Sequence, residues 1–190
     1  MSKDRIDTVD IVLSLERLTR LMRAGEHGGA LNPAQWEALR YLARANRFSD
    51  SPGALTRFLG STKGTVSQTL KALERKGLIA KTKRAHEKRS VCLELTESGK
   101  VMLASDPLLA LTGSVDELVG KVRRRLAKGL RELLRAELTR KQQPSFGVCS
   151  TCRYFREKGK EADFGGPHAC MQFEAALSNA DMKLICIEHS

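Results

Sequence analysis

The stretch 52–96 constrains the fold of this chain more than any other part of the sequence. Leu55, Phe58 and Leu59 recur at helical spacing, so they give a first short helix one apolar face. Gly60 follows at once, and a glycine just past the last apolar position is a common helix end. The segment therefore begins with a short amphipathic helix that stops sharply.

A second helix is predicted directly after this turn. Ser61 or Thr62 is placed to cap it, and Val66, Leu70 and Leu73 share one apolar face. The opposite face carries side chains that donate hydrogen bonds and are short enough to lie close to a nucleic-acid groove. These side chains are Lys63, Thr65, Ser67, Gln68 and Lys71.

A two-stranded hairpin is predicted to follow. Residues 78–83 and 90–95 have strand composition, and apolar and other residues alternate along the second. The loop between them, 84–89, is basic and polar. Two helices, a turn and a basic hairpin together form the pattern of a DNA-binding head.

This order of elements, followed by the residues LTESGK at 95–100, resembles the winged-helix core of the MarR family of bacterial transcription regulators over roughly residues 5–140. The resemblance implies a homodimeric repressor that places one recognition helix per subunit in the major groove of a pseudo-palindromic operator. It also implies that the wing reaches the minor groove, with Arg89 at the position of the family's minor-groove arginine. The expected DNA contacts are Ser61, Thr62, Lys63, Thr65, Ser67, Gln68, Lys71, Arg84, Lys88 and Arg89.

Charge and composition favour the same partner. The 190 residues carry a formal net charge of +11 and a pI near 9.7, which attracts a polyanion such as double-stranded DNA. No apolar run is long enough to span a bilayer and the N-terminus has no signal-peptide core, so we expect no membrane partner and a cytoplasmic protein. The resemblance further implies a small-molecule inducer, although no residue set in the sequence identifies its pocket.

Flanking helices are predicted to form a dimer. Residues 6–23 read as an amphipathic helix, and 114–140 as a long leucine-rich helix launched by a capping box at Ser114 and Glu117. A long apolar stripe needs a partner helix, and the N-terminal helix of a second subunit is the natural candidate. The predicted parts are therefore an N-terminal dimerisation helix (1–30), a winged helix-turn-helix domain (31–96), C-terminal dimerisation helices (97–141) and a cysteine-rich module (146–190).

The last part of the chain carries a candidate metal site. Four of the five cysteines lie there, as Cys149-x2-Cys152, Cys170 and Cys186. Soft ligands paired at short spacing and separated by foldable loops are how a small module gathers four ligands around one ion. We expect these four cysteines to bind zinc, or alternatively an iron–sulfur cluster, with His168 and His189 as alternate ligands.

The overall expectation is a mainly α protein with a small β wing: a winged helix-turn-helix with dimerisation helices and a small metal-centred module. An enzyme is not expected. A thioredoxin-like Cys-x-x-Cys would need a strand–helix context, but a proline-containing hinge precedes Cys149, and a zinc deaminase would need a His-x-Glu upstream of the cysteine pair, which is absent. The sequence also has no glycine-rich phosphate loop and no nucleophile elbow. The alternative is a metal-dependent protein-interaction adaptor with only non-specific DNA binding. The module is expected to act on the DNA-binding heads through the tilt of the long helix.

Overall fold

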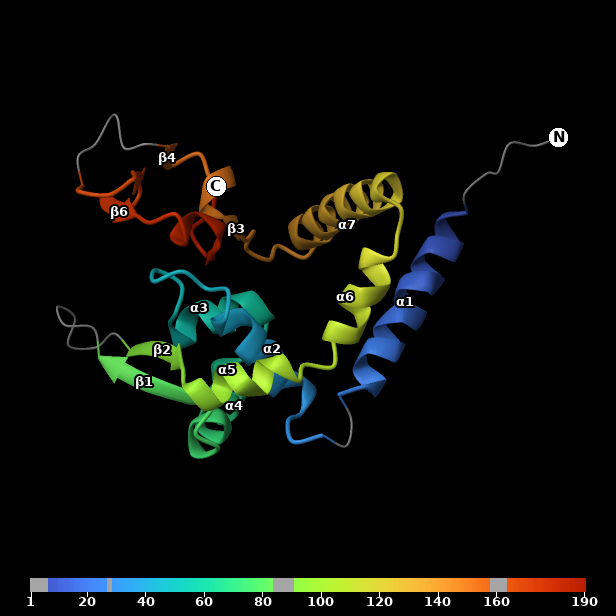
Figure 1. Ribbon diagram of the computed structural model, residues 1–190, viewed down its shortest axis with the longest axis horizontal. Helices are drawn as coiled ribbons and strands as arrows, with labels where there is room; N and C mark the ends of the chain where they lie inside the picture. The colour runs from blue at the N-terminus through green and yellow to red at the C-terminus, as the bar shows by residue number, and fades with distance from the viewer. Residues whose placement is uncertain (1–6, 27–28, 84–90, 158–163) are drawn as a thin grey trace.

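The computed structural model describes residues 7–26, 29–83, 91–157 and 164–190 of the chain, and helices dominate the first three-quarters of it (Figure 1). The helices are α1 (Thr8–Ala24), α2 (Pro33–Leu42), α3 (Pro52–Leu59), α4 (Lys63–Arg75), α5 (Glu97–Ala104), α6 (Leu109–Asp116) and α7 (Gly120–Arg140). The strands are β1 (Ile79–Lys83), β2 (Val91–Leu95), β3 (Gly147–Val148), β4 (Phe155–Glu157), β5 (His168–Cys170), β6 (Ala175–Leu177) and β7 (Ile185–Cys186).

The winged helix forms where it was predicted. Helices α2, α3 and α4 pack around buried Leu39, Leu55, Val66 and Leu70, and the antiparallel β1–β2 hairpin follows α4. Buried Trp36 lies in the same core, as expected of an apolar side chain on the inner face of α2. A mainly α fold with a small β wing is therefore confirmed.

Local signals explain where these helices begin and end. The Ser51 hydroxyl accepts a hydrogen bond from the Ala54 N–H at 3.1 Å, and Thr62, rather than Ser61, caps α4 by accepting from the Thr65 N–H at 3.1 Å. Between the two helices Gly60 adopts the left-handed conformation with φ of 57°. Most side chains would be strained there, so a glycine allows the tight turn.

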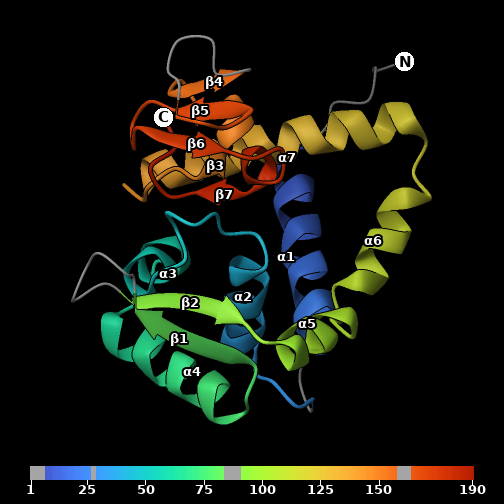
Figure 2. The ribbon, with the colours of Figure 1, turned by 60° about the vertical axis from the view of Figure 1, so that its left-hand side comes forward.

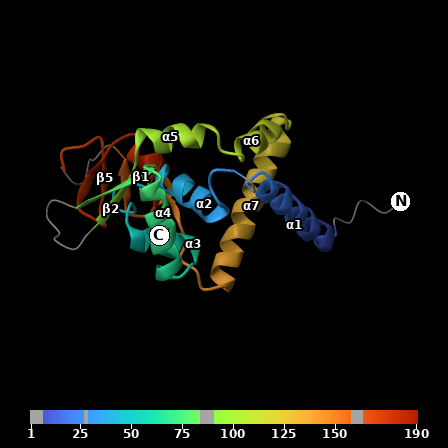
Figure 3. The ribbon, with the colours of Figure 1, turned by 90° about the horizontal axis from the view of Figure 1, so that it is seen from below.

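Helices α1, α6 and α7 lie on the side of the molecule away from the wing (Figures 1 and 3). None of their described residues is buried in the single chain. Val12 and Leu21 on α1 are more than half exposed, and Leu126 and Leu130 on α7 are 41% and 43% exposed. Both helices thus present unburied apolar side chains.

The predicted start of the long helix is wrong. Ser114 and Glu117 do not launch it, because the residues before Ser114 are already helical in α6, which ends at Asp116. The backbone at Val119 is extended in ψ (135°), and α7 begins only at Gly120, with no side-chain cap. No helix among the described residues combines the length and apolar character that crossing a bilayer requires.

The C-terminal module consists of two small sheets. Strand β3 pairs with β7, and β4, β5 and β6 form a three-stranded antiparallel sheet. Figure 2 shows the module stacked against one end of the winged helix, with α4 at the opposite end. Ile185 and Ile187 of the module belong to the main hydrophobic core, whereas its buried cysteines and Leu177 form a second cluster.

Candidate nucleic-acid interface and cysteine cluster

Helix α4 presents a continuous polar face. Val66, Leu70 and Leu73 are buried on its inner side. The side chains predicted to contact DNA lie on its outer side and are exposed. These exposed residues are Thr62, Lys63, Thr65, Ser67, Gln68 and Lys71, and Ser61 just before the helix is half-buried.

The hydroxyl groups at the start of this face are already engaged. Thr62 Oγ1 and Thr65 Oγ1 lie 2.9 Å apart, within the same cap that holds the first turn of α4. The polar atoms of the remaining face belong to Lys63, Ser67, Gln68 and Lys71. The wing residues Arg84, Lys88 and Arg89, which were predicted to contact DNA, lie outside the described residues.

The four cysteines of the module line a single small cavity. Cys149, Cys170 and Cys186 are buried, Cys152 is half-buried, and all four border a space of about 10 Å³. One water-sized sphere occupies roughly that volume. Phe48 and Phe155 pack against the cluster, so aromatic side chains shield the sulfur atoms from solvent.

Two of these thiols, Cys149 and Cys186, share a hydrogen bond. The Cys149 thiol donates a hydrogen bond to the Cys186 sulfur, and this bond lowers the pKa of Cys186 to about 6 although burial acts in the opposite direction. Hydrogen bonds from the Glu188 backbone N–H, Asn46 and Ser49 lower this pKa further. The same bond to Cys186, together with burial, raises the pKa of Cys149. One sulfur of the pair is thus favoured as a thiolate, the form that binds a metal ion.

The two alternate histidine ligands point elsewhere. The buried ring of His168 places Nε2 2.9 Å from Asn179 Oδ1. His189 Nε2 lies 3.0 Å from Thr151 Oγ1. Among the described residues no three His, Cys, Asp or Glu side chains already have metal-ligand geometry. What the structure brings together is four soft sulfur donors, which in chemical type suit zinc.

The loop between α2 and α3 supplies two polar residues that the sequence did not single out. Asn46 and Ser49 are both fully buried, and Asn46 Nδ2 donates to Cys149 Sγ at 3.4 Å. Ser49 Oγ accepts from the Ile187 N–H at 2.9 Å. A short polar loop carries no local signal of burial, because its burial depends on a segment more than one hundred residues away along the chain.

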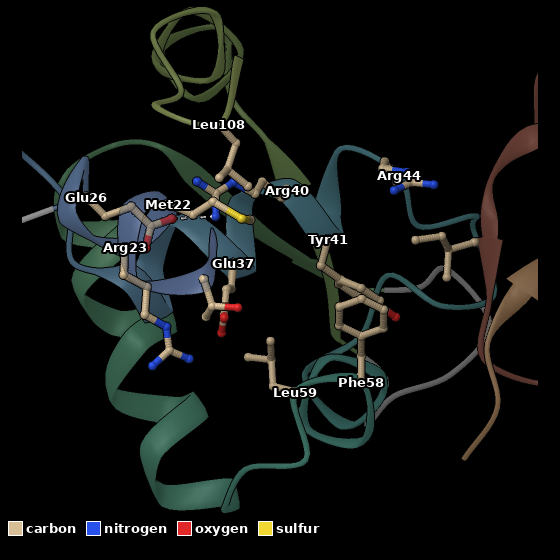
Figure 4. Close-up of a pocket in the computed structure, with 12 residues that line it drawn as sticks. Met22, Arg23, Glu26, Glu37, Arg40, Tyr41, Arg44, Phe58, Leu59 and Leu108 are labelled. Atoms are coloured by element: carbon tan, nitrogen blue, oxygen red, sulfur yellow. Dashed lines mark ion pairs between the residues drawn. The ribbon is translucent and has the colours of Figure 1, made fainter. Parts of the chain in front are cut away.

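A larger cavity of about 430 Å³ lies at the junction of α1, α2, α3 and the start of α6 (Figure 4). Its walls combine aromatic and apolar side chains with arginine and glutamate. The lining residues are Thr19, Met22, Arg23, Glu26, Glu37, Arg40, Tyr41, Arg44, Phe58, Leu59, Leu108 and Ile185.

An ion-pair cluster fixes one wall of this cavity. Arg40 contacts buried Glu26 at 2.7 Å and holds buried Asp106 through two hydrogen bonds of 2.6 and 2.7 Å. Burial alone would raise the pKa of Asp106, but the bonds from Arg40 and the Leu108 N–H outweigh it, so the pKa lies below its ordinary value. The cluster ties the end of α1 and the α5–α6 junction to α2.

Comparison with known proteins agrees with this geometry. The model of the MarR family matches residues 31–90, and no curated protein matches the chain. FabT of Streptococcus pneumoniae in complex with DNA is similar with a TM-score of 0.56 and 22% identity, covering 68% of this chain and 96% of that one.

Two further structures are similar. A MarR/EmrR family transcriptional regulator from Acinetobacter sp. ADP1 has a TM-score of 0.53 and 24% identity, over 74% of this chain and 99% of that one. The complex of Staphylococcus aureus MepR with DNA has a TM-score of 0.51 and 21% identity, over 66% of this chain and 96% of that one. Residues 31–90 therefore carry the sequence pattern of the MarR family, on a chain whose fold is the MarR-type winged helix.

Proposed function

We propose that this chain is a sequence-specific DNA-binding transcription regulator, acting as a homodimeric repressor on a pseudo-palindromic operator. The observation that carries the proposal is the exposed polar face of α4 on a MarR-type winged helix. The formal charge of +11 adds long-range attraction to DNA. Two of the similar solved structures are described as complexes with DNA, which supports the same partner for this fold.

A second subunit accounts for the apolar side chains left exposed on α1 and α7. Leu126, Leu130 and Leu133 form one stripe on α7, and each is more than two-fifths exposed in the single chain. A stripe of this length on a soluble helix marks a protein–protein contact. A two-fold dimer would bury it and present two copies of α4, matching the two half-sites of a pseudo-palindrome.

The cysteine cluster is proposed to bind one zinc ion through Cys149, Cys152, Cys170 and Cys186. When bound, zinc would cross-link the short strands of the module through its four sulfur ligands. Four cysteine thiolates would suit either one zinc ion or an iron–sulfur cluster, and zinc is the cofactor proposed here. His168 and His189, which have partners of their own, are left outside this ligand set.

The cavity between α1 and α2 is the proposed inducer site. Its volume of about 430 Å³ lies within the range of small-molecule pockets. Tyr41 and Phe58 supply aromatic walls, their ring centroids 4.6 Å apart, while Arg23 and Arg44 supply positive charge. These walls suit a small aromatic anion.

The test is selection of fragments from genomic DNA by the purified full-length protein, followed by gel shift on the fragments recovered. Nanomolar binding that saturates at two protomers per site, with at least a hundredfold weaker binding to scrambled DNA, is the expected result. Equal affinity for selected and scrambled DNA would overturn the proposal and favour the metal-dependent adaptor.

A further inference from the structure

The cysteine cluster and the DNA-binding domain contact each other along a short segment, the α2–α3 loop of residues 44–49. The Asn46 N–H donates to the Ile185 carbonyl at 2.9 Å, and the Ile185 N–H donates to the Arg44 carbonyl at 2.6 Å. Phe48 stacks on Phe173 of the module with ring centroids 4.2 Å apart. Strand β7 carries a cysteine of the cluster. It is thus bonded to this loop through both the N–H and the carbonyl of Ile185.

Asn46 joins the sulfur atoms to the backbone of the loop. Its amide nitrogen donates to Cys149 Sγ, and its Oδ1 accepts from the Phe48 N–H at 3.1 Å. The residue is fully buried. A hydrogen bond to a thiolate bound to a cation differs in strength from one to a neutral thiol, because charge on one partner roughly doubles the bond energy. The ligand state of the cluster therefore changes the bonds that shape the loop.

The loop continues directly into two elements of the DNA-binding head. Ser49 accepts from the Ile187 N–H of the module, and its own carbonyl accepts from the Tyr41 hydroxyl at 2.6 Å. The Asp50 carbonyl accepts from the Leu93 N–H of β2 at 2.7 Å, and Ser51 caps α3. A contiguous set of hydrogen bonds thus runs from Cys149 and Ile187 to the wing and to α3.

We propose that Asn46 and Ser49 are positioning residues that transmit the metal state of the cysteine cluster to the winged helix through the α2–α3 loop. This inference rests on the proposed zinc site and DNA-binding function, and it places the regulation of that function in a direct contact rather than in the long helix. Zinc binding strengthens the bonds that hold the loop, and zinc loss weakens them. Allosteric couplings between two sites commonly amount to 5- to 150-fold in affinity.

The experiment compares full-length protein in zinc-loaded and chelator-treated forms. Three quantities are measured: zinc per chain, affinity for the selected DNA fragment, and hydrogen exchange of the Leu93 backbone amide. In the wild type, zinc removal is expected to weaken DNA binding about tenfold and to speed Leu93 exchange. Asn46→Ala is expected to keep its zinc, because all four thiols remain, and to bring the affinity ratio between the two forms within twofold of one.

Two further variants keep the test decisive. Ser49→Ala is a smaller truncation with the same expected loss of coupling, and it serves where Asn46→Ala fails to fold. Asn179→Ala removes an amide that bonds His168 within the module and takes no part in the hydrogen bonds described above, so it should retain the wild-type ratio. A variant set in which Asn46→Ala and Ser49→Ala both keep the tenfold ratio would overturn the inference.

The outcomes separate this inference from the function on which it rests. Zinc and specific DNA binding with equal affinity in both forms, and unchanged Leu93 exchange, overturn the transmission alone. Failure to bind zinc overturns the metal site and the transmission together. Zinc-dependent Leu93 exchange in a protein without specific DNA binding supports the transmission and overturns the regulator.

Discussion

Two amide side chains occupy opposite environments in this molecule. Gln68 is exposed on the outer face of α4, whereas Asn46 is fully buried against Cys149. An exposed amide on a recognition helix is available to a base edge, because it offers a donor and an acceptor side by side. A buried amide is committed to its partners, because leaving it unpaired would cost desolvation energy. The same chemical group is thus exposed and available for readout in one place and part of the buried structure in the other.

Replacing Gln68 by alanine tests the readout. Gln68→Ala should weaken binding to the selected operator by about 1–3 kcal/mol and binding to random DNA much less, since base contacts discriminate and phosphate contacts do not. Lys71→Ala serves as the contrast, with similar losses expected on both DNAs. Fluorescence anisotropy at fixed salt measures both. An equal loss on the two DNAs for Gln68→Ala would remove that side chain from sequence recognition.

The Asp106 carboxylate predicts a pH dependence. Its pKa in the folded chain lies below the ordinary 3.8, because Arg40 and the Leu108 N–H bond its charged form. A depressed acid pKa contributes stability above about pH 4, and that stability is lost as pH falls through the folded value. Asp106→Asn should therefore lower the free energy of unfolding by about 2 kcal/mol near pH 7. This is less than the usual cost of breaking a buried ion pair, because Arg40 is partly exposed and solvent screens its charge.

Urea unfolding of wild type and Asp106→Asn from pH 7 to pH 3 measures this difference. The gap between the two proteins should stay constant down to about pH 5 and close as the wild-type carboxylate is protonated. Glu132→Gln is the control, because Glu132 lies on the exposed surface of α7 and its oxygen is 3.8 Å from the Lys128 nitrogen. A gap that is independent of pH would show that the charge of Asp106 does not stabilise the fold.

At the scale of elements, the sequence predicted correctly those features that depend only on residues close together in the chain. A cap at Ser61 or Thr62 and the turn at Gly60 were predicted correctly, because each depends on residues within one helical turn; the structure places the cap at Thr62. The capping pattern at Ser114 was misleading because the preceding residues were already helical. Local patterns identify a cap, but they do not show whether the chain before it has left the helix.

Helix α7 provides the test of dimerisation. Leu130→Glu should convert the dimer to monomer at micromolar concentration, because a charge would replace an apolar side chain at the centre of the stripe. Arg135→Glu, about half a turn round the helix from Leu130, is the matched control and should remain dimeric. Sedimentation equilibrium measures both. A dimer that survives Leu130→Glu with unchanged affinity would place the interface elsewhere.

On the scale of the whole molecule, the module contributes two residues to the winged-helix core and keeps a second cluster of its own. Ile185 and Ile187 are 8% and 5% exposed and belong to the same cluster as Leu39 and Leu55. No local pattern in residues 146–190 predicted this docking, because the contacts join positions more than one hundred residues apart. The sequence suggested a small module that depends on an ion; the structure adds that two residues of this module pack into the core of the winged helix.

This shared core predicts that the cysteine cluster stabilises the winged helix as well as its own module. Cys170→Ser should lose zinc and unfold the module, because the short strands there cannot hold a core without a cross-link. Ile185 and Ile187 would then leave the winged-helix core. Burial of each isoleucine is worth about 1.5–3 kcal/mol, so the free energy of unfolding of the remaining domain should fall by about 3 kcal/mol or more.

Thermal and urea unfolding, followed by helical circular dichroism and by zinc release, measure this dependence. The wild type should unfold in one transition that coincides with zinc release, and Cys170→Ser should unfold at lower urea concentration. His189→Ala is the control, because it removes a module side chain that bonds Thr151 and lies outside the proposed ligand set. A Cys170→Ser protein whose helices unfold at the same urea concentration as those of the zinc-loaded wild type would contradict the shared core, since the winged helix would then be equally stable without Ile185 and Ile187.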